Sequence, residues 1–349
     1  MDDRNAQVGW SEAQWNRVRE EVFRAWQSVR VAGSFLPVYD ALPRSTQVVP
    51  SEVFLADGTI DERSVSPLVE ISLPVTLSRQ QVLEDDLASA LLQFRRRATQ
   101  VAQLEDWYVF NGTYPGGFAP AAPPALAARV GPSTTFVPSF PFLTGLPANW
   151  PVVRGAPDPI AERRTMIQGL LRRDPGTLGL IYGARRVRQN TRGTPTLQGW
   201  STRGRLTSKG LMSVIVQAMN RLEENGFVAP YACVFGRRPF ETAHRPVPQS
   251  VTYPRDRIEP LIGRELLHSS GLDVVPQPFQ QSYWPYSQQW QSRGVLLSLA
   301  GEAVDLAVAA EATPEFRQVD VDGRYVFSVF ERFTLRIKDS TAIVPLRFY

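Results

Sequence analysis

The sequence predicts an α+β protein, and three observations support that class. Residues 69–77 alternate apolar and mostly polar side chains, which is typical of a half-buried β-strand. From Leu87 to Tyr108 the apolar residues recur every three or four positions instead, which indicates one face of a long helix. Roughly the last hundred residues consist mostly of strand-like stretches. Long helices and separate runs of strand are therefore expected.

The first helix is predicted from a capping signal near the N-terminus. Ser11 is a suitable N-cap, and Gln14 stands where a capping box needs its second member. The apolar stripe that follows consists of Trp15, Val18, Val22, Ala25, Trp26 and Val29. Gly33 is expected to end this helix. Because two tryptophans and Phe23 are more apolar surface than a free arm should expose, another element must cover them.

The remaining elements can be bounded from their stop signals. The long helix carries Leu87, Leu91, Phe94, Ala98, Val101, Leu104 and Tyr108 on its apolar face. It should end near Gly112, which can adopt the left-handed cap. A second helix is predicted over 208–224, followed by a strand over 231–235, whereas the Pro-rich residues 245–254 indicate a loop. The turn signal Asp322-Gly323 precedes a long strand over 325–337.

Two segments are less regular. Asp57-Gly58 lies between short apolar pieces within residues 46–66 and predicts a surface hairpin. Residues 114–176 are so rich in proline that regular elements are disfavoured. The aromatic residues Phe136, Phe140, Phe142 and Trp150 nevertheless argue against disorder. We interpret this segment as an irregular, ordered insertion that ends in a short helix over about 159–173.

Composition favours a cytoplasmic protein of one large domain or two. The chain has 349 residues, and 43% of them are hydrophobic, which suffices for a sizeable core. No apolar run approaches membrane-spanning length, and the start Met1-Asp2-Asp3-Arg4 is unlike a signal peptide. The single cysteine, Cys233, excludes an internal disulfide and a Cys-rich metal site, and we expect it in a buried strand.

The positive charge is too small and too scattered to predict nucleic-acid binding as the main role. The net charge is +4 and the isoelectric point is about 9.4. Lys209 and Lys338 are the only lysines, so arginine supplies nearly all of the positive charge. The nearest cluster, Arg95-Arg96-Arg97, lies on the long helix, with Arg95 and Arg96 away from its apolar face. A solvated or intersubunit face explains this cluster better than a phosphate-binding stripe.

The sequence offers no catalytic constellation. His244 and His268 are the only histidines, and metal-binding, nucleophile-elbow and phosphate-loop motifs are absent from the sequence. Glu84-Asp85-Asp86 is best explained by the dipole of a helix start. Glu105-Asp106 is the pair that we expect to meet arginines within or between subunits. We therefore predict no enzymatic activity, no metal and no cofactor.

Four blocks, taken in chain order, resemble encapsulins, the bacterial and archaeal shell proteins that share their fold with the major capsid proteins of tailed phages. They are Ser11–Trp15 with the helix after it; Pro67–Glu70 with a spine helix that ends in Glu105, Asp106, Phe110 and Gly112; Asn225–Gly236; and the strands Gly294–Leu299 and Tyr325–Arg336, which resemble the paired strands that close the family's chain. Together the blocks span roughly three quarters of the sequence, far more than one short motif. Residues 114–176 have no counterpart in a typical member.

The resemblance implies a phage-capsid-like fold with five parts. An N-terminal helix and arm would occupy residues 1–45, and an extended loop that reaches a neighbouring subunit would occupy 46–66. A peripheral domain with the spine helix would combine 67–113 and 294–349. The Pro-rich insertion, 114–176, would precede an apical domain over 177–293.

The same resemblance implies that copies of the chain self-assemble into a hollow icosahedral nanocompartment. It would enclose a cargo enzyme, such as a ferritin-like protein or a peroxidase, recruited through a short terminal peptide. That peptide would dock beside the N-terminal helix, and the candidate contacts are Val22, Phe23, Trp26, Val29 and Asp40. Alternatively, these side chains simply pack against the spine helix.

Three further expectations follow from the family. The loop with Tyr253, Arg255 and Asp256 resembles the segment that approaches the fivefold pore. Flavin is not predicted, because Ser78–Gln81 lacks the aromatic residue on which some members stack it. Ser34 stands where a basic residue is common, which weakens the cargo assignment. The alternative function is that of a phage or prophage major capsid protein that packages DNA.

Overall fold

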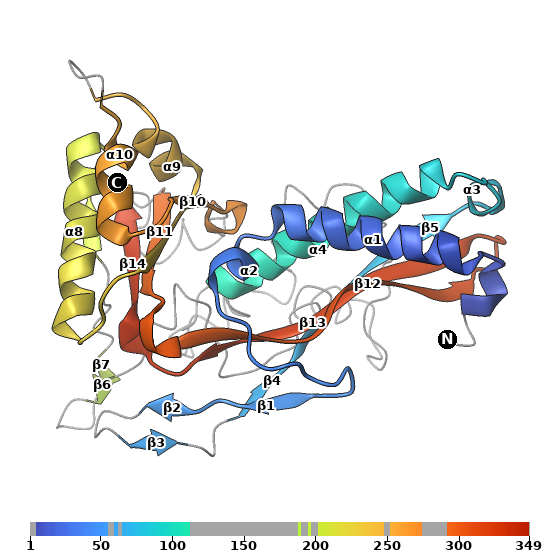
Figure 1. The fold of residues 1–349 in the computed structure, drawn as a ribbon, viewed down its shortest axis with the longest axis horizontal. Helices are drawn as coiled ribbons and strands as arrows, with labels where there is room; N and C mark the ends of the chain where they lie inside the picture. The colour runs from blue at the N-terminus through green and yellow to red at the C-terminus, as the bar shows by residue number, and fades with distance from the viewer. Residues whose placement is uncertain are drawn as a thin grey trace, which may run out of the picture.

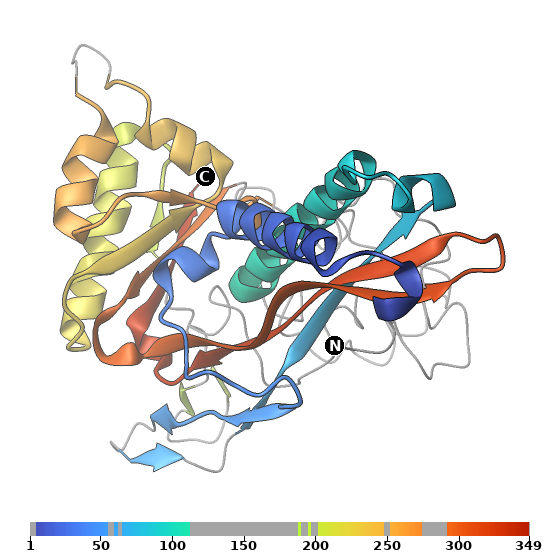
Figure 2. The ribbon, with the colours of Figure 1, turned by 45° about the vertical axis from the view of Figure 1, so that its right-hand side comes forward.

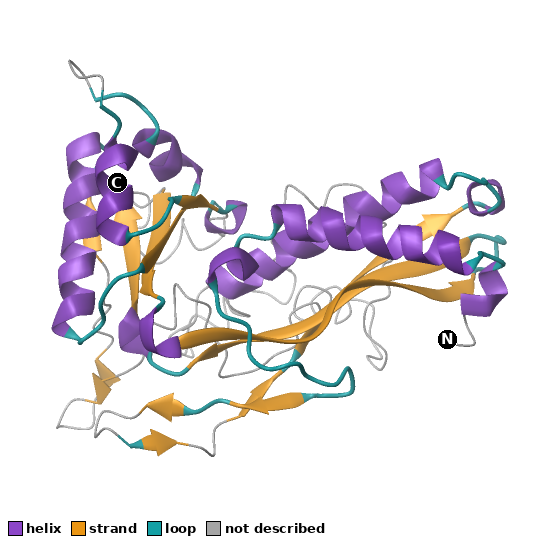
Figure 3. Ribbon diagram, in the orientation of Figure 1, coloured by secondary structure: helices purple, strands orange, loops and turns teal. Residues whose placement is uncertain are grey.

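The structure is a computed structural model that describes residues 5–54, 59–61, 65–111, 188–189, 195–196, 202–247, 252–273 and 292–348. Helices and strands form two bodies (Figures 1 and 3). In the elongated body, two long helices lie over a twisted sheet; in the compact body, helices pack on a second sheet. The predicted α+β class is therefore confirmed. The predicted insertion, 114–176, and its helix lie outside the described residues.

The elongated body is built on a three-stranded antiparallel sheet with the order β12-β13-β5. Its strands are β5 (Val69–Leu77), β12 (Val304–Val319) and β13 (Tyr325–Ile337). Alternate residues of β5 from Val69 to Leu77 are buried, as the alternation predicted. The turn before β13 contains Gly323 at φ 72°, which confirms the turn expected at Asp322-Gly323.

Helices α1 (Glu12–Val29) and α4 (Ala88–Asn111) lie side by side over one face of this sheet (Figures 1 and 2). The predicted apolar face of α4 is buried at every position from Leu91 to Tyr108. Leu87, the first predicted position, is also buried but precedes the helix, with φ 52°. Ser11 and Gln14 form the predicted capping box of α1. The buried stripe of α1 packs against α4 and the sheet, which together cover its tryptophans. The Trp15 ring lies 6.1 Å from that of Phe327 on β13.

The predicted end of α1 at Gly33 is wrong. The helix ends at Val29, and Gly33 lies inside a separate short helix, α2 (Ala32–Phe35). The reason for a glycine here is space, because the guanidinium of Arg30 occupies the position where a Cβ on Gly33 would stand. The turn between α1 and α2 therefore serves the packing of Arg30.

The compact body is a five-stranded sheet with the order β10-β9-β11-β14-β8. The strands are β8 (Thr202–Gly204), β9 (Tyr231–Phe235), β10 (Leu267–His268), β11 (Ser292–Ser298) and β14 (Ile343–Phe348). Helices α8 (Ser208–Glu224), α9 (Arg237–Ala243) and α10 (Pro254–Ile262) pack with it. The predicted helix 208–224 and strand 231–235 are confirmed, and α10 begins where the expected loop 245–254 ends.

Side chains of the five-stranded sheet alternate between two hydrophobic cores. Tyr231, Cys233 and Phe235 join the core beneath α8 and α10, so Cys233 is buried in a strand as expected. Ala232 and Val234 join the core that α1 and α4 share with the three-stranded sheet. Because successive residues of a strand point to opposite faces, one strand links the cores of both bodies.

Strand pairing corrects the expected arrangement of the chain's last strands. β11 pairs with β9 and β14, whereas β13 pairs with β12 and β5, so 294–299 and 325–336 lie in different sheets. Val295, Leu296 and Leu297 are all fully buried, which requires a strand covered on both faces. β11 and β14 therefore belong with the sheet of β9 rather than with the spine helix. The domain boundaries remain a prediction, with this change to their C-terminal part.

The described residues between 46 and 67 pair as the hairpin predicted over 46–66 requires. β1 (Val48–Pro50) pairs with β4 (Val65–Pro67), and β2 (Val53–Phe54) pairs with β3 (Ile60–Asp61), both antiparallel. Asp57-Gly58 lies outside the described residues. The smaller elements are η1 (Asn5–Val8), α3 (Arg79–Val82), β6 (Arg188–Gln189), β7 (Pro195–Thr196), η3 (Ser270–Leu272), η6 (Ala300–Glu302) and η7 (Ser340–Ala342).

Candidate assembly and cargo surfaces

The residues predicted to dock a cargo peptide divide into core and surface. Val22 and Trp26 are buried, with 0% and 1% of their surface exposed, and Val29 is half-buried. Phe23 is 37% exposed, and Asp40, on the arm after α2, is exposed as well. Val22 and Trp26 therefore hold α1 on the body, and only the other three can offer surface to a peptide.

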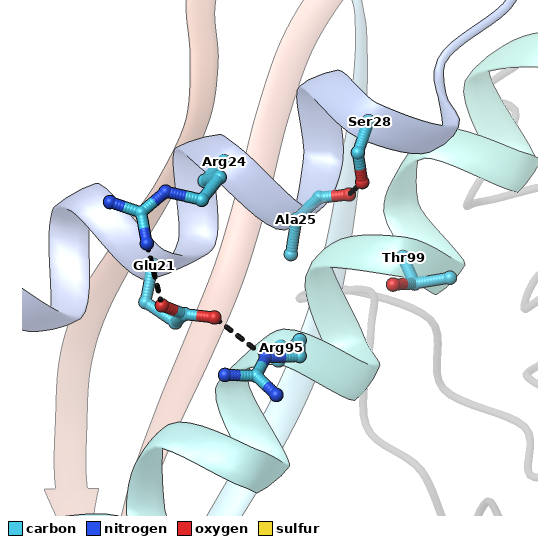
Figure 4. A pocket seen from close by; sticks show the side chains of 6 residues that line it. All are labelled: Glu21, Arg24, Ala25, Ser28, Arg95 and Thr99. Carbon is cyan, nitrogen blue, oxygen red and sulfur yellow. Dashed lines mark hydrogen bonds and ion pairs between the residues drawn. The ribbon is translucent and has the colours of Figure 1, made fainter.

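A shallow pocket of about 280 Å³ lies between α1 and α4 (Figure 4). Its lining consists of Glu21, Arg24, Ala25, Ser28, Arg95 and Thr99. Glu21 stands between two arginines, with its carboxylate 2.6 Å from Arg95 and 3.6 Å from Arg24. Sequence reasoning missed this pocket, because it depends on how the polar flanks of two helices meet.

The pocket and Phe23 occupy opposite flanks of α1. Glu21, Ala25 and Ser28 recur at helical spacing and face α4. Phe23 lies on the other side of the buried stripe, two helical turns before Arg30 and on the same side as it. A peptide bound to Phe23 would therefore not occupy the pocket. The pocket is charged and open, whereas the flank of Phe23 presents an aromatic ring, 5.7 Å from that of Trp26.

The hairpin of residues 46–67 exposes apolar side chains. Val48, Ile60 and Val65 are 53%, 48% and 59% exposed. The hairpin runs along the side of the elongated body that is opposite α1 and α4 (Figures 1 and 2). A two-stranded hairpin with solvated valines is marginal alone and gains stability when a further surface covers it.

The residues expected near a pore lie at the start of a helix rather than in a loop. Tyr253 precedes α10, and its N–H donates to the carboxylate of Asp256 over 3.2 Å. The guanidinium of Arg255 lies 3.5 Å from Asp256 and 5.6 Å from the centre of the Tyr253 ring. Arg255 and Asp256 have side chains 43% and 50% exposed, so both charges face solvent.

The most polar buried site joins α1, α4 and β13. The Arg30 Nε donates to Glu105 over 2.7 Å, and the Trp26 Nε1 donates to Glu331 over 3.1 Å. The Arg30 guanidinium also lies 4.3 Å from the centre of the Trp26 ring. Glu105 and Glu331 are fully buried, so two carboxyl groups share one guanidinium away from water. The predicted meeting of Glu105 with an arginine is confirmed, and it is intramolecular.

The pKa values of these carboxyl groups respond to that burial. Burial raises the pKa of Glu105 to about 7, against the opposing attraction of Arg30. Burial and then the negative charge of Glu105 raise the pKa of Glu331 well above its ordinary value. Glu105 Oε2 and Glu331 Oε1 have no other donor, and the two groups can bond to each other when one holds a proton. The arrangement is that of a proton-sharing pair.

Asp106 ties both bodies together. Its carboxylate accepts from the N–H groups of Val31 and Ala32, the latter over 2.8 Å, and from the Ser269 hydroxyl over 3.2 Å. Burial and then the charge of Glu105 raise the pKa of Asp106 to about 8, although these three donors oppose the rise. Beside it, Gly271 of η3 packs so that an added Cβ would lie 3.1 Å from the backbone of Trp107. This is where α4 meets the compact body.

The described part of the chain shows no grouping of three or more His, Cys, Asp or Glu side chains that could hold a metal ion. His244 and His268 instead pack on the ring of Phe240, with ring centres 4.1 and 5.2 Å away. None of the helices in the described residues is both long and apolar enough to span a membrane.

Comparisons with known proteins identify one matching family model and several solved structures of similar fold. The model of the family described as "Encapsulating protein for peroxidase" matches residues 196–275, which include the Asn225–Gly236 block. A virus-like particle from Pyrococcus furiosus superposes with a TM-score of 0.55 at 10% identity, covering 95% of this chain and 99% of that chain. No curated protein matches the sequence.

Two further solved structures are similar at lower scores. The holo-SrpI encapsulin complex from Synechococcus elongatus PCC 7942 has a TM-score of 0.48 at 9% identity, over 93% of this chain and 86% of that one. The capsid of a native GTA particle has a TM-score of 0.48 at 11% identity, over 91% and 89% of the two chains. The expected phage-capsid-like fold is confirmed by the virus-like particle, of which this chain covers 99%. The chain thus shares its fold with a virus-like particle and, over residues 196–275, matches the family described as an encapsulating protein for peroxidase.

Proposed function

We propose that this chain is a structural shell protein without catalytic activity, whose copies form a hollow icosahedral nanocompartment around a cargo enzyme in the cytoplasm. The observation that carries the proposal is the hairpin of residues 46–67, on a fold that a virus-like particle shares. Its exposed Val48, Ile60 and Val65 would be buried against a neighbouring copy. Closed symmetric assembly converts such surfaces into interfaces, which in permanent complexes bury about 2,000 Å² or more each.

The direct test is to express the chain alone and image it by electron microscopy, with the protein and nucleic-acid absorbance of the same fraction. The proposal predicts uniform hollow particles free of nucleic acid. Particles filled with nuclease-protected DNA would favour the alternative, a phage or prophage capsid protein. A small soluble oligomer would contradict the assembly of a shell.

The cargo is proposed to be a peroxidase or a ferritin-like protein, and the description of the matching family names peroxidase. Its terminal peptide would bind the exposed flank of α1, with Phe23 and the half-buried Val29 as apolar contacts and Asp40 as a polar one. Val22 and Trp26 would support that flank from the core. A flat aromatic on a helix fixed by buried neighbours is a suitable anchor for an apolar peptide side chain.

Phe23→Ala separates this proposal from a purely structural role. Phe23 lies outside the buried stripe and is 37% exposed, so the variant should still assemble but retain much less co-expressed cargo. The matched control is Leu92→Ala on α4, which removes an apolar side chain that is 64% exposed elsewhere. Equal cargo loading in Phe23→Ala and the control would contradict the site.

We further propose that Tyr253, Arg255 and Asp256 line an entry route for small ions. Support comes from the exposed charges at the start of α10. Exchanging both charges for neutral side chains, in Arg255→Gln with Asp256→Asn, should change the rate at which enclosed cargo turns over an external ionic substrate. Unchanged turnover inside intact shells, with free cargo as the reference, would contradict this role.

A further inference from the structure

The three-stranded sheet carries charged residues on the face turned away from α1 and α4. On β13, Phe333 and Leu335 point into the core, so Arg332 and Arg336, separated by an even number of positions, point to the opposite face. Asp305 of β12 lies on this opposite face, because its neighbour Leu306 is in the core. The arm, here residues 37–45, and the base of the hairpin cross this face, where Tyr39, Arg44 and Pro50 contact Arg336 or Arg332.

Arg336 contacts three segments of the chain: β12, the end of β1 and the arm. Its side chain is fully buried, and its Nε and Nη2 donate to the two carboxylate oxygens of Asp305 over 2.6 and 2.5 Å. Its Nη1 donates to the carbonyl of Pro50, the last residue of β1, over 2.9 Å. The ring of Tyr39, on the arm, lies 3.6 Å from the guanidinium carbon. The planar fork of arginine can satisfy all three geometries at once, which an ammonium group cannot do.

Neighbouring contacts also hold the backbone of the arm against the sheet. Arg332 Nη1 donates to the carbonyl of Arg44 over 2.8 Å, and its Nη2 meets Glu70 of β5. Tyr39 N–H donates to the carbonyl of Leu306 over 2.9 Å, which adds the arm to the edge of β12. Because arginine here binds main-chain carbonyls, it fixes the course of the backbone rather than the identity of the side chains.

We propose that Arg336 is the positioning residue that sets the direction in which the hairpin leaves the subunit and, through it, the closure of the shell. The inference rests on the proposed function, in which a second copy of this chain covers the hairpin. Arg336 lies at the hairpin's base and not at its exposed valines. A small change of angle at Pro50 would therefore move the distal strands β2 and β3 relative to the neighbouring copy.

The test is Arg336→Lys in the full chain, with Arg324→Lys, at an exposed arginine of the β12–β13 turn, as the matched control. Lysine keeps the charge beside Asp305 but loses the bidentate pair and the bond to Pro50. We expect a folded subunit whose assembled fraction falls about tenfold, or whose particles vary in diameter, because one charge-assisted hydrogen bond is lost at the hairpin. The control should give wild-type particles. Particle diameter is measured by electron microscopy, and folding by circular dichroism and thermal unfolding.

Tyr39→Leu is the second variant, because it removes the stacked ring without disturbing the buried charges. It should shift the diameter distribution in the same direction as Arg336→Lys. If Arg336→Lys gives wild-type particles, the inference about Arg336 is wrong but the proposed function stands. If Arg336→Lys fails to fold, wild-type particles from Tyr39→Leu lead to the same conclusion. Absence of particles from the wild-type chain would instead refute the proposed function, and the inference with it.

Discussion

Glu331→Gln should make the protein more stable at alkaline pH. Glu105 and Glu331 are buried around one guanidinium, that of Arg30, so they carry one negative charge in excess unless one of them holds a proton. Glutamine keeps an oxygen that accepts from the Trp26 Nε1, and its amide can donate to Glu105. The variant therefore removes the excess charge and preserves the hydrogen bonds.

The sign and size follow from the raised pKa values. A carboxyl group whose pKa is higher in the folded chain binds more protons there, so stability falls as pH rises between the unfolded and folded pKa. For Glu105 this window runs from 4.5 to about 7. A difference of about 2.5 pKa units corresponds to about 3 kcal/mol of stability lost across the window. This loss belongs to Glu105 and stays in the variant, because burial is its main cause. Glu331→Gln removes the further loss due to the raised pKa of Glu331 itself, so the variant should be more stable than wild type at pH ~8 and little different at pH ~5.

The assay is urea unfolding of the full chain followed by tryptophan fluorescence at both pH values. Asp106, whose pKa is also raised, to about 8, stays in the variant, so a residual fall of stability with pH should remain. Glu311→Gln, at an exposed position of β12, is the control and should behave like wild type. A larger loss of stability in Glu331→Gln at pH ~8 than at pH ~5 would refute the proton-sharing pair.

Three other substitutions test the packing of α1 and of η3, each by the urea unfolding described above. Trp26→Ala should cost about 3–5 kcal/mol, because it empties a core site and removes the donor to Glu331; a loss below about 1 kcal/mol would contradict its core role. Ser11→Ala should cost about 1 kcal/mol through the lost capping box, and an unchanged midpoint would show that the cap is dispensable. Gly271→Ala should cost about 1–3 kcal/mol, since the new methyl group meets the backbone of Trp107; a neutral effect would mean that η3 moves aside.

Local patterns in the sequence were enough to place most of the elements. The capping box at Ser11, the buried face of α4 and the strand 231–235 follow from residues a few positions apart, and the structure has them where the spacing predicted. The order of four family-like blocks also pointed to the capsid fold. Caps and periodicities depend on residues close in sequence, so they can be recognised without knowledge of the fold.

Within the candidate sites, sequence reasoning found the residues but not their environments. The spacing put Val22 and Trp26 on the apolar stripe of α1 and left Phe23 outside it, yet it could not say whether a cargo peptide or the body of the subunit covers that stripe. It noticed Glu105 as a partner for arginine but not Glu331, which comes from β13 and has no local signal. The charged pocket of α1 and α4 was invisible for the same reason, since each helix supplies only part of it.

The sequence by itself determined most of the long helices and strands, and its four blocks pointed to the capsid-like fold. Only the tertiary structure decided which sheet β11 and β14 join and where the hairpin is anchored. Arg336 and Pro50 are 286 positions apart, and no periodicity connects a guanidinium to a carbonyl at that separation. Such contacts form because burial of a charged group demands partners from whichever segments packing brings near it, and packing is a property of the whole chain.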